Sequence, residues 1–218
     1  MNLFENPTVE TDRALAYKLF AECYYPPDEN LLSQAERLGR AAGLVCPTAA
    51  EAIDLMAAGL AAVNGIEELA VDHARLFVGP FSLLAPPYGS IYLDGERRLM
   101  GDSTLDAAEC YREVGLELAS GLSGTPDHVA AELEFMHFLS IKELDAHAGG
   151  DTIRAGNFRK KQSAFLVRHL AAWAPDFTRS VEEQAQTLFY KGLAAATRVF
   201  VESDCKRLSA ESQNHKRI

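Results

Sequence analysis

Apolar residues recur along most of this chain at spacings of three and four, the period of a helix that buries one face. In the first such segment, residues 11–24, the positions Leu15, Leu19 and Cys23 form one stripe, and Pro26-Pro27 end it. We find no strongly patterned sheet and no internal repeat. The pattern therefore predicts an all-α fold.

Breaks and caps divide this pattern into predicted helices over about 11–24, 28–42, 48–63, 66–78, 103–114, 126–147, 153–174 and 179–208. The boundaries depend on a capping box at Thr48 and Glu51, a cap at Ser103, a Thr125-Pro126 start and a stop at Pro175. The polar tail from about 209 should fray. We expect one domain over 1–218, a multi-helix bundle.

A long loop rich in proline and aromatic residues separates the fourth and fifth predicted helices. It begins at Gly79-Pro80 and contains Pro86-Pro87-Tyr88. Long loops in compact domains are usually functional, and an apolar one is unusual because connecting segments normally face water. Asp94-Gly95 permits a hairpin, which we rank below an extended loop because a lone hairpin is marginally stable.

Composition narrows the classes of partner. The 218 residues carry a formal net charge of -10, which argues against nucleic acid and suits a cationic partner. The four cysteines form no CxxC pair, so neither a zinc ribbon nor a redox motif is expected. With no secretory signal and no apolar run long enough to span a bilayer, we expect a soluble, cytoplasmic protein.

Enzyme chemistry has weak support in the sequence. No phosphate-binding loop or nucleophile elbow occurs, so we expect no catalytic residue, no metal and no cofactor. The alternative is a metal-dependent helical hydrolase that uses the sixth predicted helix. Its ligands would come from His73, Asp127, His128, Glu132, Glu134, His137 and His147, but no His-x-x-x-His pair lies among them.

A binding surface is the better interpretation of the loop. Leu76 and Phe77 lie on the last turn of the fourth predicted helix, next to Pro86, Pro87 and Tyr88. Proline loses little entropy on binding, and tyrosine supplies a rigid face with a polar rim. Ordinary core positions for Leu76 and Phe77, and a simple turn at Pro87-Tyr88, remain the alternatives.

The start of the sixth predicted helix carries Asp127 and His128 in its first turn. The helix dipole there favours a carboxylate and a neutral imidazole, and a carboxylate can hold a guanidinium with two hydrogen bonds. A charged helix start with a surface histidine is the alternative. For Glu132, one turn further on, we expect a solvated side chain.

Five collinear motifs together resemble one protein family. They are Arg75-Leu-Phe-x-Gly79, Pro86-Pro-Tyr-Gly-Ser90, Gly101-Asp-Ser-Thr104, Pro126-Asp-His128 and Glu132-Leu-Glu-Phe-Met136. Their order and spacing are similar to those of the TorD/DmsD family of redox-enzyme maturation chaperones, which is related to NarJ. The resemblance spans roughly Leu15 to Phe200.

That resemblance implies an all-helical chaperone whose partner is a twin-arginine leader peptide on the precursor of a molybdopterin oxidoreductase catalytic subunit. It also implies a monomer or a domain-swapped homodimer. Carried over by position, the leader-binding residues are Leu76, Phe77, Pro87, Tyr88, Gly101, Asp127 and His128. Some relatives have tryptophan where Tyr88 stands.

Overall fold

The computed structural model of the protein describes residues 7–79, 83–95, 99–116 and 125–214. Within these ranges the chain is helical and has no strand, apart from one isolated bridge between Tyr88 and His128, so the predicted all-α fold is confirmed. The helices are α1 (Pro7–Cys23), α2 (Leu31–Val45), α3 (Ala50–Ala62), α4 (Ile66–His73), α5 (Ser90–Leu93), α6 (Asp102–Arg112), α7 (Val129–Ala148), α8 (Thr152–Arg168), α9 (Leu170–Gln184) and α10 (Leu188–Asn214), with a 3₁₀ turn at Pro47–Ala49 and a π-helical turn at Ala74–Val78.

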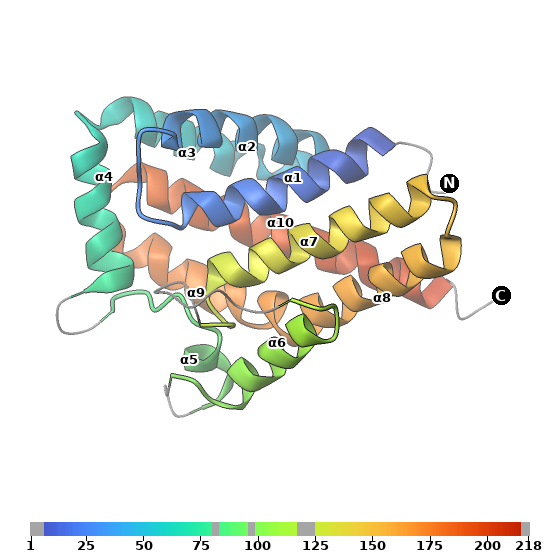
Figure 1. Cartoon of the computed structure of the whole chain (residues 1–218). Helices are drawn as coiled ribbons and strands as arrows, with labels where there is room; N and C mark the ends of the chain where they lie inside the picture. Colours follow the sequence, from blue (N-terminus) through green and yellow to red (C-terminus); the bar gives the residue numbers. More distant parts are fainter. Residues whose placement is uncertain (1–6, 80–82, 96–98, 117–124, 215–218) are drawn as a thin grey trace.

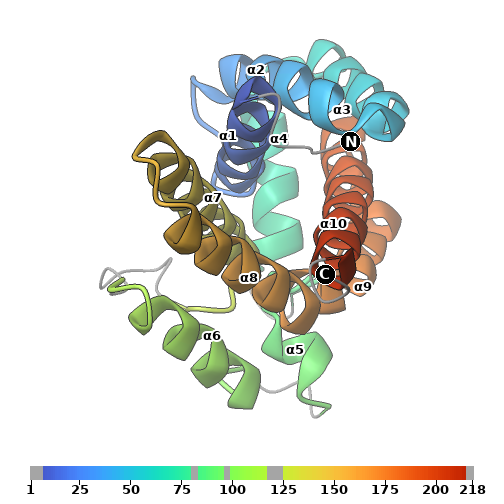
Figure 2. The same ribbon diagram turned by 90° about the vertical axis from the view of Figure 1, so that its right-hand side faces the viewer.

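The long helices α1, α7, α8 and α10 run along the length of the bundle, and α4 stands across one end of it (Figure 1). Helix α1 packs on α2 and α7, while α10 packs on α3, α9 and α8. The short helices α5 and α6 form an arm on the side opposite α2 and α3 (Figure 2). Helix α5 attaches this arm to α9.

Two glycines allow α3 and α10 to approach closely. A Cβ atom on Gly59 would collide with the backbone of Phe189, and one on Gly192 would collide with the backbone of Met56. Because backbone cannot move aside as a flexible side chain can, both positions require glycine for this packing distance.

A buried ion pair joins the first helix to the last. The Arg13 side chain is fully buried, and its guanidinium donates two hydrogen bonds of 2.7 Å to the Asp204 carboxylate. Tyr17 donates a third bond to Asp204, and Arg13 also donates to Gln162 on α8 at 2.7 Å and to Ser140 on α7 at 3.1 Å. Four helices therefore meet at one arginine.

A second charged cluster lies where α1 begins. Glu10 accepts hydrogen bonds from Arg159 on α8 and from Arg207 on α10. Burial opposes the ionisation of Glu10, but the charges of Arg13, Arg159 and Arg207 outweigh it and lower its pKa from 4.5 to about 2.

Several predicted helix starts are wrong. Thr48 is part of a 3₁₀ turn and contacts the Cys46 thiol instead of capping a helix. Helix α6 begins at Asp102 after Gly101, so Ser103 is inside it, where its N–H and hydroxyl bond to Asp94. Helix α7 begins at Val129 rather than at Pro126, and His128 is its N-cap.

The predicted break at Pro175 is also wrong. The chain breaks at His169, where the imidazole bonds to Asp106 and stacks on Phe165, and Pro175 lies inside α9. These tertiary contacts outweigh the local preference of proline. Helix α9 ends at Gln184, and α10 extends to Asn214, beyond the expected start of a frayed tail at 209.

The long loop is only partly as expected. Residues 90–93 form the single turn α5 rather than a hairpin or an extended segment. Residues 80–82 and 96–98 of the predicted loop lie outside the described ranges.

Across the described ranges, no single helix combines the length and apolar character that a bilayer span needs. Among the described residues, one pair of segments has that length and apolar character when the two are counted together: Pro47–Ala62 and Ile66–Val78, which are bent by 120° relative to each other.

We expect Arg13→Ala to lower the free energy of unfolding by about 3–5 kcal/mol, because it leaves the Asp204 charge buried without its partner. Urea unfolding followed by circular dichroism measures this loss. The control is Arg179→Ala, which removes an ion pair to Asp176 whose side chains are 65% and 62% exposed. That change should cost less than about 1 kcal/mol, and equal losses in both variants would contradict a special role for Arg13.

The Glu10 cluster predicts a specific acid sensitivity. Because its pKa is lowered on folding, Glu10 stabilises the fold above about pH 4.5, and this contribution is lost as the pH falls towards 2. The difference in unfolding free energy between wild type and Glu10→Gln should shrink over this window by roughly 3 kcal/mol at most. The control is Glu109→Gln, because the Glu109 side chain is 53% exposed. The unfolding free energy of this variant should change with pH as that of the wild type does.

Candidate functional site

Two segments distant in sequence meet at the Tyr88–His128 bridge. Gly89 N–H donates to the Asp127 carbonyl at 2.8 Å, and Val129 N–H donates to the Pro87 carbonyl at 2.9 Å. The Tyr88 and His128 rings pack edge to face, with centroids 5.3 Å apart. The loop that follows the fourth helix is therefore fixed to the start of α7.

Asp127 reinforces this junction from the inside. Its side chain is fully buried, and Oδ2 accepts a 2.8 Å hydrogen bond from the N–H of Ser90, the first residue of α5. Oδ1 has no hydrogen-bond partner in the part of the chain that the structure describes. The expected position of Asp127 in the first turn of the helix is wrong, because α7 starts two residues later, at Val129.

His128 is half-buried and caps α7. Its Nδ1 accepts a hydrogen bond of 3.1 Å from the N–H of Ala130, so this nitrogen carries no proton. Burial lowers the pKa of His128 to about 4, although the nearby Asp127 carboxylate acts in the opposite direction. The imidazole is therefore neutral at pH 7, as expected from the sequence, but burial rather than the helix dipole is the main cause.

Leu76 and Phe77 lie in the π-helical turn and face the core. Leu76 is fully buried, and the Phe77 ring packs against Tyr24, Phe177 and Tyr190. The Leu76 carbonyl accepts a 3.0 Å hydrogen bond from Ala85 N–H, which holds the returning loop against the turn. These contacts match the ordinary core positions that we kept as the alternative.

An acidic residue that the sequence did not single out fixes this turn. Asp72 is buried, and its Oδ2 accepts 2.8 Å hydrogen bonds from both the N–H and the hydroxyl of Thr187, just before α10. It also pairs with Arg75, whose guanidinium donates to the Gln184 carbonyl. The turn that carries Leu76 and Phe77 is thus attached to the connection between α9 and α10.

The remaining predicted site residues lie in two separate parts of the structure, the Tyr88–His128 bridge and the start of α6. Pro86 and Pro87 are buried beside the bridge. Gly101 lies at the start of α6, where a Cβ would collide with the Asp94 carboxylate. Contacts therefore connect Pro87, Tyr88, Asp127 and His128 to one another, whereas Gly101 packs against another part of the loop.

Glu132 and Trp173 form a buried layer beneath the bridge. Glu132 is fully buried, not solvated as expected, and accepts a 2.9 Å hydrogen bond from Trp173 Nε1. Burial raises the pKa of Glu132 well above its usual value. A Cβ on Gly89 would lie only 3.0 Å from Trp173 Nε1, so glycine allows the loop to approach this layer.

The histidines proposed for a hydrolase do not converge. His73 bonds to the Tyr24 carbonyl, His137 bonds to the Ala14 carbonyl, and His147 lies beside Glu143 near the far end of α7. The hydrolase alternative therefore has no structural support among the described residues.

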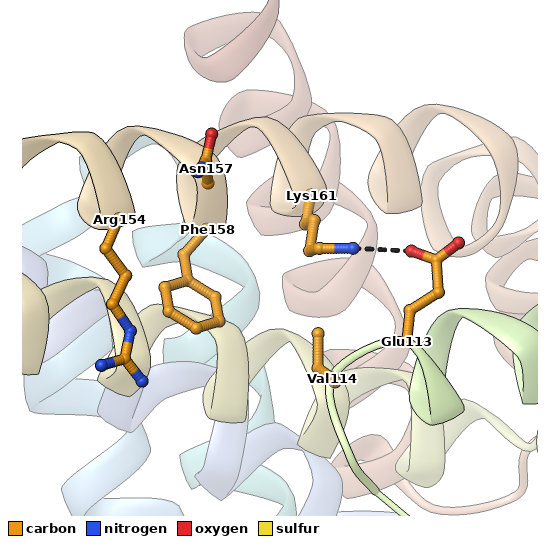
Figure 3. Close-up of a pocket in the computed structure, with 6 residues that line it drawn as sticks. All are labelled: Glu113, Val114, Arg154, Asn157, Phe158 and Lys161. Carbon is orange, nitrogen blue, oxygen red and sulfur yellow. Dashed lines mark hydrogen bonds and ion pairs between the residues drawn. The ribbon is translucent and has the colours of Figure 1, made fainter.

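A small hollow of about 170 Å³ lies between α8 and the end of α6 (Figure 3). The Lys161–Glu113 ion pair, at 2.6 Å, crosses one side of it. None of the predicted site residues lines this hollow.

The family model described as nitrate reductase delta subunit matches residues 41–179, more than half of the chain. The chain belongs to this TorD/DmsD and NarJ-related family of maturation chaperones. It is 32% identical to a Tat proofreading chaperone DmsD of Salmonella typhi, over 70% of this chain and 68% of that protein. It is 28% identical to a chaperone protein TorD of Shewanella pealeana, over 73% and 70% of the two chains.

Two further relatives extend the family comparison. A perchlorate reductase assembly chaperone protein of Dechloromonas aromatica is 32% identical, over 64% of this chain and 63% of that protein. A solved structure described as a redox enzyme maturation protein, from Archaeoglobus fulgidus, is 30% identical and superposes with a TM-score of 0.52, covering 87% and 93% of the two chains. The family assignment thus holds in sequence and in fold.

We expect Asp127→Ala to lower the free energy of unfolding by about 1–3 kcal/mol, because Ser90 N–H loses its buried acceptor. Asp127→Asn should cost less, since an amide oxygen can still accept that hydrogen bond. Chemical denaturation of the three proteins measures the order, and a larger loss for Asn than for Ala would contradict it.

Proposed function

We propose that this protein is a cytoplasmic chaperone for the precursor of a molybdopterin oxidoreductase catalytic subunit. In this proposal it binds the twin-arginine leader, assists cofactor insertion and delays export until maturation is complete. Membership of the maturation chaperone family supports this role, as do relatives that are named Tat proofreading chaperones. The proposed state is a monomer or a domain-swapped homodimer.

The observation that carries the proposal is the convergence of Pro87, Tyr88, Asp127 and His128 at one bridge. Tyr88 and His128 are half-buried there, so neither residue is closed off from solvent. An edge-to-face aromatic pair offers a rigid apolar surface with polar rims. In our proposal the apolar part of the leader packs on these two rings.

The buried residues have a supporting role in this proposal. Leu76 and Phe77 lie in the core behind the loop, and Pro86 and Pro87 are buried residues of the loop itself. Asp127 holds the loop to α5 and α7. We assign Gly101 to the shape of the connection between α5 and α6. Of the predicted binding residues, only Tyr88 and His128 are proposed to pack their side chains directly on the leader.

Charge favours the same partner. The net charge of -10 attracts a leader that carries paired arginines. At an exposed rim each arginine pair should add about 0.2–1 kcal/mol, so apolar contact should supply most of the affinity. A small interface of this kind suggests micromolar binding, about -8 kcal/mol.

The test is calorimetric titration of the protein with a synthetic twin-arginine leader peptide. We expect Tyr88→Ala and His128→Ala to weaken binding by about tenfold each, because each removes an aromatic contact surface. Ile153→Ala is the control, since this α8 side chain is 79% exposed and should leave binding unchanged. Wild-type affinity in both site variants would exclude the bridge as the leader site.

A second peptide, with both arginines changed to glutamine, tests the contribution of charge. It should bind more weakly, by a factor that falls as salt is raised, because exposed ion pairs are screened. Equal binding of the two peptides at low salt would contradict recognition of the arginines, while leaving recognition of the apolar segment intact.

A further inference from the structure

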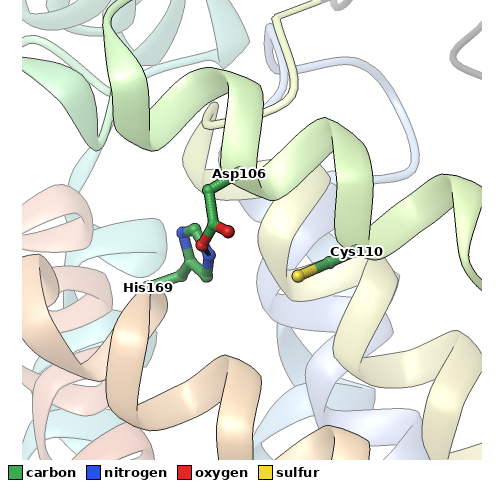
Figure 4. Close-up of side chains that lie close together, drawn as sticks. All are labelled: Asp106, Cys110 and His169. Carbon is green, nitrogen blue, oxygen red and sulfur yellow. Dashed lines mark hydrogen bonds and ion pairs between the residues drawn. The ribbon is translucent and has the colours of Figure 1, made fainter.

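Three side chains with metal-binding groups lie together between α6 and the junction of α8 and α9. Asp106 and Cys110 are one turn apart on α6, and His169 occupies the break before α9 (Figure 4). One ligand atom from each lies within 4.8 Å of the others. His169 Nε2 is already 2.8 Å from Asp106 Oδ2.

The combination of an imidazole nitrogen, a thiol sulfur and a carboxylate oxygen is one that Zn²⁺ accepts in a four-coordinate site, with water as the fourth ligand. His169 is only 2% exposed, and its ring stacks on Phe165 with centroids 4.6 Å apart. Its orientation is therefore fixed by packing. Asp106 and Cys110 are half-buried, which leaves a path for an ion from solvent.

The other side of the His169 ring provides independent support. Its Nδ1 has no hydrogen-bond partner within the described residues, and neither does Glu132 Oε1, which lies 4.0 Å away. Glu132 is fully buried. A histidine that binds a metal through one nitrogen usually presents the N–H of the other to a carboxylate or carbonyl, which fixes the tautomer.

A positive group already binds two of the three proposed ligands. Arg168 Nη2 lies 3.0 Å from Asp106 Oδ2 and 3.1 Å from Cys110 Sγ. The Arg168 side chain is 53% exposed, so it can move outward into solvent without leaving a buried cavity. Asp106 and Cys110 thus already bind a cation that an ion could replace.

We propose that Asp106, Cys110 and His169 form a binding site for a divalent ion of the zinc class, which displaces the Arg168 guanidinium. On binding, Cys110 coordinates as the thiolate and its proton passes to solvent, while His169 coordinates through Nε2 and directs Nδ1–H towards Glu132. The bound ion joins α6 to the junction of α8 and α9. The proposal is independent of leader binding and differs from our expectation, made from the sequence, that the chain has no metal site.

The full chain, purified without metal, is titrated with Zn²⁺ in competition with a chromophoric chelator, and separately with Co²⁺ followed by its thiolate absorption. We expect one ion per chain. Asp106→Asn and Cys110→Ala should each weaken binding at least about tenfold. Arg168→Ala should strengthen it, because the competing cation is removed.

Cys205→Ala is the matched control, because Cys205 is also half-buried but lies on α10 and outside the cluster. It should bind Zn²⁺ as wild type does, and circular dichroism checks that every variant is folded. Absence of stoichiometric binding in both wild type and Arg168→Ala would overturn the proposal. So would unchanged affinity in Cys110→Ala, or an equal loss in Cys205→Ala.

Discussion

The buried pair of Arg13 and Asp204 is the constraint on which the bundle depends. A charge removed from water is costly unless hydrogen bonds replace its hydration, and here Asp204, Gln162 and Ser140 surround the guanidinium. Those partners lie on α10, α8 and α7, so satisfying one side chain of α1 fixes the relative positions of four helices. The remaining helices pack on this frame.

A buried carboxylate also holds the candidate site together. Asp127 is inaccessible to solvent; its carboxylate binds Ser90 N–H of α5, and its backbone carbonyl binds Gly89 N–H of the loop. We expected Asp127 to contact a ligand directly. Its contacts instead hold Tyr88 and His128 next to each other. Next to this junction, the buried Glu132 carboxyl accepts a hydrogen bond from Trp173 Nε1.

The helical period of the sequence was sufficient to predict the all-α fold, because each amphipathic stripe must bury its own face. Local signals failed where a distant contact decided the outcome. The chain breaks at His169, whose imidazole bonds to Asp106, 63 residues earlier, and no local pattern contains that contact. Loop composition and helix-start chemistry pointed to Tyr88 and His128 separately, as did the resemblance to a family, but spacing alone cannot pair the two residues.

The chain forms a π-helical turn at Ala74–Val78. A hydrogen bond in such a turn spans one residue more than a hydrogen bond in an α-helix. Gly79 N–H reaches the Ala74 carbonyl across this wider ring. If the extra residue were absent, the side chains on one side of the turn would rotate by about 100° around the helix axis. Val78, now 61% exposed, would then approach the position of Phe77 in the aromatic core. Whether Phe77 or Val78 packs in the aromatic core therefore depends on the number of residues in this turn as much as on which residues they are.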